Sequence, residues 1–72
     1  MGFKITAIIC GSEFSAETET IAGAYERIRS ILNNCGEVEF NKLSKYMMIL
    51  VDMYQGEVEP RHYDNYLIIE KV

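Results

Sequence analysis

The feature that most constrains this chain is an apolar run from Tyr46 to Tyr54, which only Asp52 interrupts. The run has no regular alternation of apolar and polar residues, and this is typical of a strand covered on both faces. We therefore predict a central strand over residues 46–54. A helix over 43–54 fits the same stretch. Its apolar face would hold residues at i, i+3, i+4, i+7 and i+11, namely Leu43, Tyr46, Met47, Leu50 and Tyr54.

The length of the chain limits the core that this run can enter. Its 72 residues make one domain, 1–72, and a domain of this size buries only about 60% of the surface that its unfolded chain exposes. Such small domains often gain stability from disulfides, a metal or a partner subunit. Two cysteines, Cys10 and Cys35, provide neither a disulfide framework nor a zinc site, so we expect no metal and no other cofactor. Dimerisation remains, and we predict a homodimer.

Alternating patterns predict strands near both ends of the chain, over residues 2–10 and 65–72. Apolar residues that repeat at intervals of three and four predict a helix over 16–33. Residues 11–15 would form the turn before this helix, with Ser15 as its N-cap. Asn34 and Gly36 would end the helix in a left-handed turn.

The middle of the chain predicts shorter elements. Residues 37–40 alternate and are expected to form a strand with Phe40 turned inward, and 41–45 would turn the chain into the central strand. Residues 55–64 are polar and contain a glycine and the only proline, which predicts a loop. The resulting order is β-α-β-β-β. This is an α+β domain with a single helix packed on one face of a small four-stranded mixed sheet.

A single helix covers only one face of such a sheet. The opposite face is expected to carry a larger apolar patch than soluble monomers usually expose. Methionine and tyrosine would make this patch adaptable to a protein partner or to a second copy of the chain. Its members would come from Thr6, Ile8, Tyr46, Met48, Leu50 and Tyr54.

The net charge of the chain limits the classes of partner that it can bind. Eleven acidic and seven basic residues give a net charge of −4, which opposes binding to a phosphate backbone, so we expect no direct nucleic-acid binding. Glu57 and Glu59 form one of several short acidic groups, which either keep the protein soluble or meet a basic protein partner. With no secretory signal and no apolar segment of membrane-spanning length, we expect a cytoplasmic protein with reduced thiols and no membrane association.

Residue types that support catalysis are sparse. His62 is the one histidine, and no serine or cysteine stands at a spacing that indicates a nucleophile. Asp52 is interpreted as a rim residue, with a buried carboxylate as the alternative. We therefore predict that the protein is not an enzyme and has no catalytic residues.

The chain contains no motif that assigns it to a family. In its size, its acidity and its lack of motifs it resembles the small inhibitors that phages and mobile elements encode against host nucleases, including anti-CRISPR proteins. This resemblance implies a viral protein that inhibits a host enzyme by binding to it.

Two functions from different classes follow from these observations. In the first, a non-catalytic interaction module uses the apolar sheet face, and its acidic loops meet a basic surface. In the second, a dimeric protein binds a small molecule with the loop over 55–64. The candidate binding residues for the two functions together are Tyr46, Met48, Leu50, Tyr54, Glu57, Glu59, Arg61, His62 and Tyr63.

Overall fold

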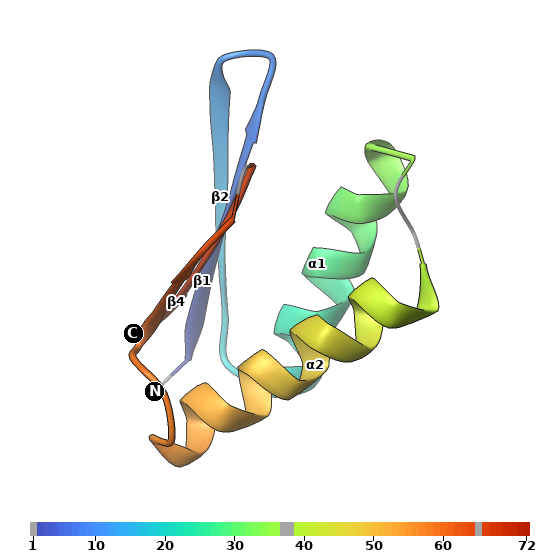
Figure 1. Ribbon diagram of the computed structural model, residues 1–72. Helices are drawn as coiled ribbons and strands as arrows, with labels where there is room; N and C mark the ends of the chain where they lie inside the picture. Colours follow the sequence, from blue (N-terminus) through green and yellow to red (C-terminus); the bar gives the residue numbers. More distant parts are fainter. Residues whose placement is uncertain (1, 37–38, 65) are drawn as a thin grey trace.

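The computed structural model of the protein describes residues 2–36, 39–64 and 66–72. Within these ranges, two strands are followed by two helices and then by two more strands, and both helices lie on one side of the sheet (Figure 1). The elements are β1 (Phe3–Ile9), β2 (Ser12–Thr18), α1 (Ile21–Asn34), α2 (Phe40–Gln55), β3 (Arg61–Tyr63) and β4 (Leu67–Lys71). The α+β class is therefore confirmed, whereas the prediction of a single helix is wrong.

The sheet has the order β2-β1-β4-β3, and all of its neighbouring strands are antiparallel. The predicted mixed sheet is wrong because β1 leads into β2 through a tight hairpin and not through a helical crossover. Cys10 and Gly11 form the hairpin turn with φ angles of 52° and 80°. Positive φ at both central residues is typical of a type I′ turn, whose twist matches that of the two strands. Ser15 consequently lies in the middle of β2 and is not a helix N-cap.

Helix α1 begins at Ile21, later than predicted, because Ala16 pairs with Ile5 in the sheet. The residue that caps the helix is Thr20, whose backbone is extended and whose Oγ1 accepts a hydrogen bond from the Gly23 amide at 3.0 Å. The extension of β2 therefore moves the start of α1 by about one turn.

The far end of α1 agrees with the sequence. The helix ends at Asn34, and Gly36 follows with a φ of 69°, which confirms the left-handed stop. The inward side of α1 carries apolar residues at helical spacing, and four of them are buried: Ala24, Ile28, Ile31 and Leu32.

The apolar run forms α2, so the predicted central strand is wrong. Tyr46, Leu50 and Met53 are buried along this helix at intervals of four and three. Four of the nine residues in the run are methionine or leucine, which have high helix propensity, and only two are β-branched. The helical alternative over 43–54 is the one that the structure adopts.

Helix α2 ends in a well-defined motif. Gly56 takes the left-handed conformation with a φ of 77°, its N–H donates to the Met53 carbonyl, and the Glu57 N–H donates to the Asp52 carbonyl. This pair of bonds is a Schellman motif, which satisfies two carbonyl groups that the helix leaves free. The glycine after the run is thus a helix stop and not the start of a hairpin loop.

The predictions for residues 37–45 and 55–64 differ from the structure where it forms α2 and β3. Residues 37–38 of the predicted strand over 37–40 lie outside the described residues, while Phe40 is the first residue of α2 and 41–45 are helical. The predicted loop over 55–64 contains the strand β3, which pairs with β4. The strand at the C-terminal end of the chain is confirmed as β4.

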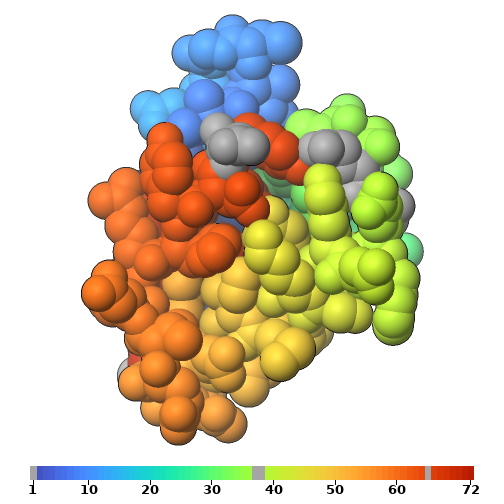
Figure 2. All heavy atoms as spheres, in the orientation of Figure 1, coloured from blue at the N-terminus to red at the C-terminus, as the bar shows by residue number. Residues whose placement is uncertain are grey.

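The core lies between the sheet and the two helices. Every second residue of β1 points to this side, as do two residues of β4, and both helices close over them. In the space-filling view, α2 (yellow-green to orange) forms much of the surface below the projecting tip of the β1–β2 hairpin (blue) (Figure 2). The fully buried large side chains are Phe3, Ile5, Ile28, Leu32, Leu50, Met53, Leu67 and Ile69.

Candidate functional site

An apolar groove lies where α1 meets the first half of α2. It has a volume of about 350 Å³. The hydroxyl groups among its lining side chains are those of Ser44 and Tyr25. α1 supplies one aromatic wall, and α2 supplies the rest. The lining residues are Tyr25, Phe40, Leu43, Ser44, Met47 and Met48.

Two of the lining side chains project from the surface. Phe40 is 80% exposed and Met48 is 65% exposed, whereas Tyr25, Leu43 and Met47 are half-buried and form the walls. A projecting apolar side chain therefore stands directly beside an apolar depression. Contiguous apolar surface of this kind marks interaction sites in soluble proteins.

The periodicity of α2 explains why this surface exists. Phe40, Ser44, Met47 and Met48 stand at i, i+4, i+7 and i+8, which places them along one side of the helix. The buried residues of α2 follow a second stripe, turned toward the sheet. α2 thus has two apolar stripes, of which only one is used by the core.

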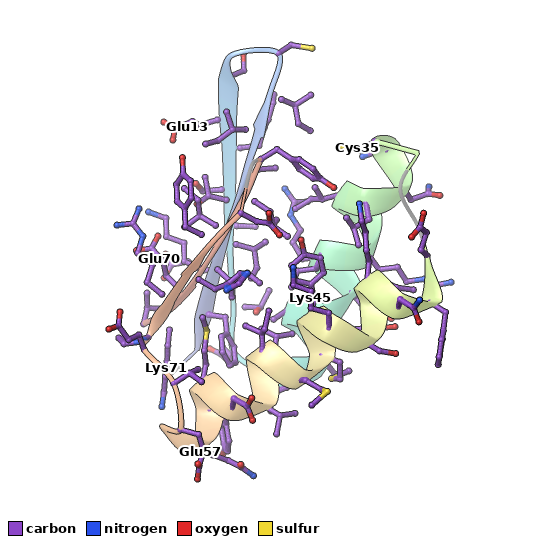
Figure 3. All side chains as sticks on the ribbon, in the orientation of Figure 1. Glu13, Cys35, Lys45, Glu57, Glu70 and Lys71 are labelled. Atoms are coloured by element: carbon purple, nitrogen blue, oxygen red, sulfur yellow. The ribbon has the colours of Figure 1, made fainter. Side chains whose placement is uncertain are left out.

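The sheet face turned away from the helices, called the uncovered face below, is more polar than the apolar surface that was predicted. The strand register places polar and charged side chains side by side across it, and Glu13 and Glu70 are seen on this side in Figure 3. In strand order, one row across this face is Glu17, Lys4, Glu70 and Arg61, and the next is Ser15, Thr6, Ile68 and Tyr63. The hydroxyl groups of Thr6 and Ser15 are hydrogen-bonded at 3.0 Å.

The aromatic and apolar residues that the sequence assigns to that face lie on α2 instead. Tyr46 and Leu50 are buried in the core, with 3% and 0% of their surface exposed. Met48 and Tyr54 are exposed, as expected, but they project from the helix. The prediction of an apolar patch made by a central strand is therefore wrong, because that strand is a helix.

A small polar cluster ties α2 to β3 and to Asp64, the residue that follows β3. The Tyr46 hydroxyl donates to Asp64 Oδ2 at 2.7 Å, and Lys45 Nζ lies 3.5 Å from the same oxygen. The ring of His62 meets the ring of Tyr46 edge to face, with the ring centroids 6.4 Å apart. These contacts hold the helix against the sheet, and no nucleophile takes part in them.

The structure separates the residues predicted to act together in the loop over 55–64. Arg61 and Tyr63 lie in the two rows of side chains on the uncovered face, whereas His62 points to the helix side. This follows because side chains alternate along a strand. A depression of about 200 Å³ is lined by Arg61 and His62 but not by Tyr63. Glu57 and Glu59 are exposed, as Figure 3 illustrates for Glu57 beside the end of α2.

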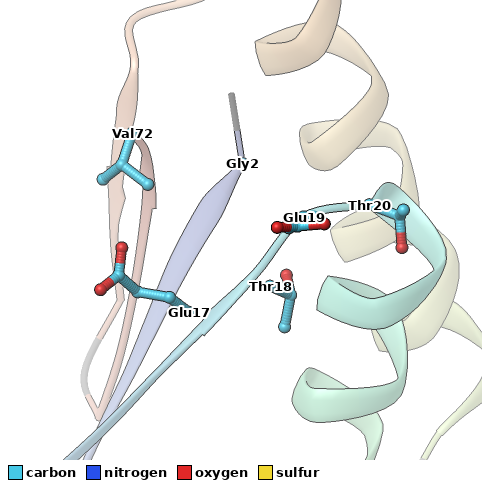
Figure 4. Close-up of a pocket in the computed structure, with 6 residues that line it drawn as sticks. All are labelled: Gly2, Glu17, Thr18, Glu19, Thr20 and Val72. Atoms are coloured by element: carbon cyan, nitrogen blue, oxygen red, sulfur yellow. The ribbon is translucent and has the colours of Figure 1, made fainter.

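A wider depression lies at the end of the sheet, where β2 leads into α1 (Figure 4). It has a volume of about 890 Å³ and is lined partly by Glu17, Thr18, Glu19 and Thr20. The carboxylates of Glu17 and Glu19 point in different directions, and the Thr20 hydroxyl is engaged as the helix cap. Carboxylates and hydroxyls without a base that could activate them do not form a nucleophilic site.

The described residues do not gather into a metal site, a disulfide or a membrane-spanning helix. Among the described residues, no three histidine, cysteine or acidic side chains gather in a way that could hold a metal ion. Cys10 and Cys35 are free thiols, the first exposed at the hairpin tip and the second following α1. Neither helix has the length and hydropathy needed to cross a membrane.

Of the six residues that line the groove, only Met48 is among the predicted binding residues. The other five were missed: Tyr25, Phe40, Leu43, Ser44 and Met47. Phe40 is assigned to the interior of a strand by alternation, although it begins a helix. The helical template over 43–54 places Leu43 and Met47 together, so this template was the signal that could have found them.

Comparisons with protein-family models, with curated proteins and with solved structures gave no match.

Proposed function

We propose that the protein is a small non-enzymatic interaction module that forms a homodimer through the groove between α1 and α2. The observation that carries this proposal is the side chain of Phe40, which is 80% exposed beside an apolar groove of about 350 Å³. Fully burying a phenylalanine side chain contributes about 1.5–3 kcal/mol. Association through this surface would therefore gain free energy that the monomer leaves unused.

A second copy of the chain suits this surface because a projection and a depression lie on the same patch. In a two-fold dimer a patch meets its own copy, so each Phe40 can enter the groove of the other protomer. Met47 and Met48 are flexible, and they can adapt the walls to the ring that enters. A projection on one patch and a depression on a distant one would instead produce an open chain of subunits.

The non-enzymatic role is supported by the chemistry of the groove. Its lining is aromatic and aliphatic apart from Ser44, and no described histidine or carboxylate lines it. A host nuclease as the target stays a prediction, which rests on the size and acidity of the chain. In that case exposed Glu57 and Glu59 would face a basic surface of the target. A cytoplasmic location likewise stays a prediction, resting on the cysteine content.

The test is the mass of the protein in solution. At about 100 µM, above the micromolar Kd typical of a weak specific interface, light scattering should give twice the monomer mass of 8.3 kDa. Phe40→Ser should return the mass to that of the monomer. The matched control is Tyr63→Ser, since Tyr63 is also exposed but lies on the uncovered sheet face. A monomeric wild-type protein, or a dimer unaffected by Phe40→Ser, would contradict the proposal.

A small-molecule site beside the loop over 55–64 is the alternative function. Its support is the depression lined by Arg61 and His62, where the His62 Nε2 atom is buried and has no hydrogen-bond partner among the described residues. The volume of about 200 Å³ is below the roughly 300–1,000 Å³ of most ligand pockets. A rise in melting temperature with a small-molecule library, abolished by Arg61→Ala, would favour this function over the dimer.

A further inference from the structure

We infer that β2 is a docking edge for an extended basic segment of another protein, which would join the sheet as an additional strand beside β2. This surface lies on a different part of the molecule from the groove between the helices. The inference therefore goes beyond the proposed function and does not depend on it.

The backbone of β2 offers hydrogen-bonding groups to such a strand. Gly2 exchanges both of its backbone hydrogen bonds with Val72, and the Ile8 N–H donates to the Tyr66 carbonyl. In an antiparallel ladder the direction of these groups alternates, so the even-numbered residues of β1 face β4 and the odd-numbered ones face β2.

The register then fixes which groups of β2 remain free. The odd-numbered residues of β1 pair with Ser12, Phe14, Ala16 and Thr18, whose backbone groups are used within the hairpin. The N–H and C=O groups of the alternate residues, Glu13, Ser15 and Glu17, point away from β1. No described strand pairs with this side of β2, because β2 is the edge of the sheet.

The two edges of the sheet differ in how they are protected. β3 is three residues long, and Pro60 precedes it directly. β2 is seven residues long, contains neither proline nor lysine, and keeps an unbroken register along its whole length. Natural proteins usually shorten or interrupt an edge strand, or place proline or charged residues, above all lysine, on it to prevent pairing. The charged residues of β2 are glutamates only, which repel acidic strands but not basic ones. β2 thus keeps the geometry that strand addition requires.

The charges on the uncovered face define the chemistry of the incoming strand. Across the row that starts at Glu17, the sign alternates from strand to strand: Glu17, Lys4, Glu70 and Arg61. A cation beyond Glu17 would continue this alternation. Glu13 stands opposite Ile8, and neither Glu13 nor Glu17 forms an ion pair within the described part of the chain. Opposite charges on neighbouring strands stabilise their pairing.

The other side of β2 offers an apolar contact. Phe14 is 52% exposed on the helix side, at the rim of a depression of about 370 Å³ that Ile9 and Ile31 also line. Apolar residues of an incoming strand would alternate with its basic residues and pack against Phe14 and Ala16. The occupant is therefore an amphipathic strand, basic on one side and apolar on the other.

A second copy of β2 does not meet this description. Pairing β2 with β2 would bring Glu13 and Glu17 of both chains onto neighbouring strands of one face, with no cation from either β2. Like charges in such positions destabilise a sheet. The same glutamates that favour a basic strand therefore oppose self-pairing at this edge.

The test uses a synthetic probe. The peptide Thr-Lys-Val-Thr-Val-Lys-Thr, acetylated and amidated, reads the same in both directions, so either strand orientation can place lysines opposite Glu13 and Glu17. The matched control replaces both lysines with glutamate. In an NMR titration of the full chain carrying Phe40→Ser, the basic peptide should bind at least about tenfold more tightly than the acidic one. Hydrogen exchange should slow at the amides of Glu13, Ser15 and Glu17.

Two variants separate strand addition from simple charge attraction. Ser15→Pro removes an outward N–H without removing a hydrogen bond of the hairpin, whereas Ser15→Ala keeps that N–H and loses only the side-chain bond to Thr6. We expect Ser15→Pro to weaken binding at least about tenfold and Ser15→Ala to change it by no more than about twofold. Equal binding by the two variants would overturn the inference.

A charge reversal keeps the test decisive if Ser15→Pro fails to fold. The double variant Glu13→Lys/Glu17→Lys should prefer the acidic peptide by about tenfold, which reverses the preference of the unreversed chain. An unchanged preference, or binding shifts centred on elements other than β2, would overturn the inference. Dimerisation of the Phe40→Ser chain that is abolished by Ser15→Pro would also overturn it, in favour of a second copy at this edge.

Discussion

The two helices cover the same face of the sheet but differ on their outward sides. α1 buries four apolar residues and presents polar groups to solvent, including an ion pair between Glu26 and Arg29 at 4.0 Å. α2 buries three residues in the core and exposes Phe40, Met48 and Tyr54 on other sides. α1 is thus an ordinary amphipathic covering helix, while α2 carries more apolar surface than covering the sheet requires.

Their N-terminal ends differ as well. Thr20 caps α1 with a side-chain hydrogen bond to the Gly23 amide, whereas the capping residue of α2, Glu39, makes no such bond. The stability of α2 must therefore come mainly from its packing, since short helices are marginal on propensity alone. The helix that carries the candidate interface is the one that depends more on its tertiary contacts.

The largest effect should come from the contact between α2 and the core. Leu50→Ala removes a side chain with 0% exposure and should lower the free energy of unfolding by about 2–5 kcal/mol. Met48→Ala, on the outward side, should change it by no more than about 0.5 kcal/mol. Urea denaturation in a Phe40→Ser background measures both without a contribution from dimerisation. Comparable losses would mean that α2 does not divide into a core side and an outward side.

A smaller effect is expected at the cap of α1. Thr20→Ala leaves the Gly23 amide without its side-chain acceptor and should cost about 1 kcal/mol. Thr20→Ser retains the hydroxyl and should preserve most of that stability. Thermal unfolding of the two variants checks this. Equal melting temperatures for Thr20→Ala and Thr20→Ser would show that the cap makes no difference and that α1, like α2, depends on packing alone.

The same contrast explains what could be predicted from the sequence. α1 was identifiable because its outward side is polar, so apolar residues stand out at intervals of three and four. In α2 the outward residues Phe40, Met48 and Tyr54 are themselves apolar. They occupy positions where polar residues would have revealed the helical period. The surplus of apolar residues that misled the secondary-structure prediction is the same surplus that forms the groove.

The strands show a related limit. β1 begins with alternating apolar and polar residues, and β4 begins with three apolar residues in a row; the sequence predicts both strands. β2 lies at the edge with most of its residues exposed, so only Phe14 and Ala16 mark its inward side. The turn that creates β2 depends on positive φ at Cys10, a residue without special preference for that conformation. Among the candidate site residues, Met48 is exposed as predicted, although the prediction placed it on a strand and it lies on α2. Its neighbours in the groove required the fold.

The smallest expected effect tests whether a side-chain cap at residue 39 would stabilise the first turn of α2. Glu39 already has the extended backbone of an N-cap, with φ −134° and ψ 144°, so a shorter hydroxyl side chain can accept from an amide of the first turn. Glu39→Ser should therefore raise the free energy of unfolding by about 0.5 kcal/mol, while Glu39→Ala, which removes the same charge without providing an acceptor, should not. Urea denaturation of both variants in the Phe40→Ser background measures the difference. If serine and alanine prove equal, the first turn of α2 is held by packing alone, and the absence of a side-chain cap at Glu39 has no effect on its stability.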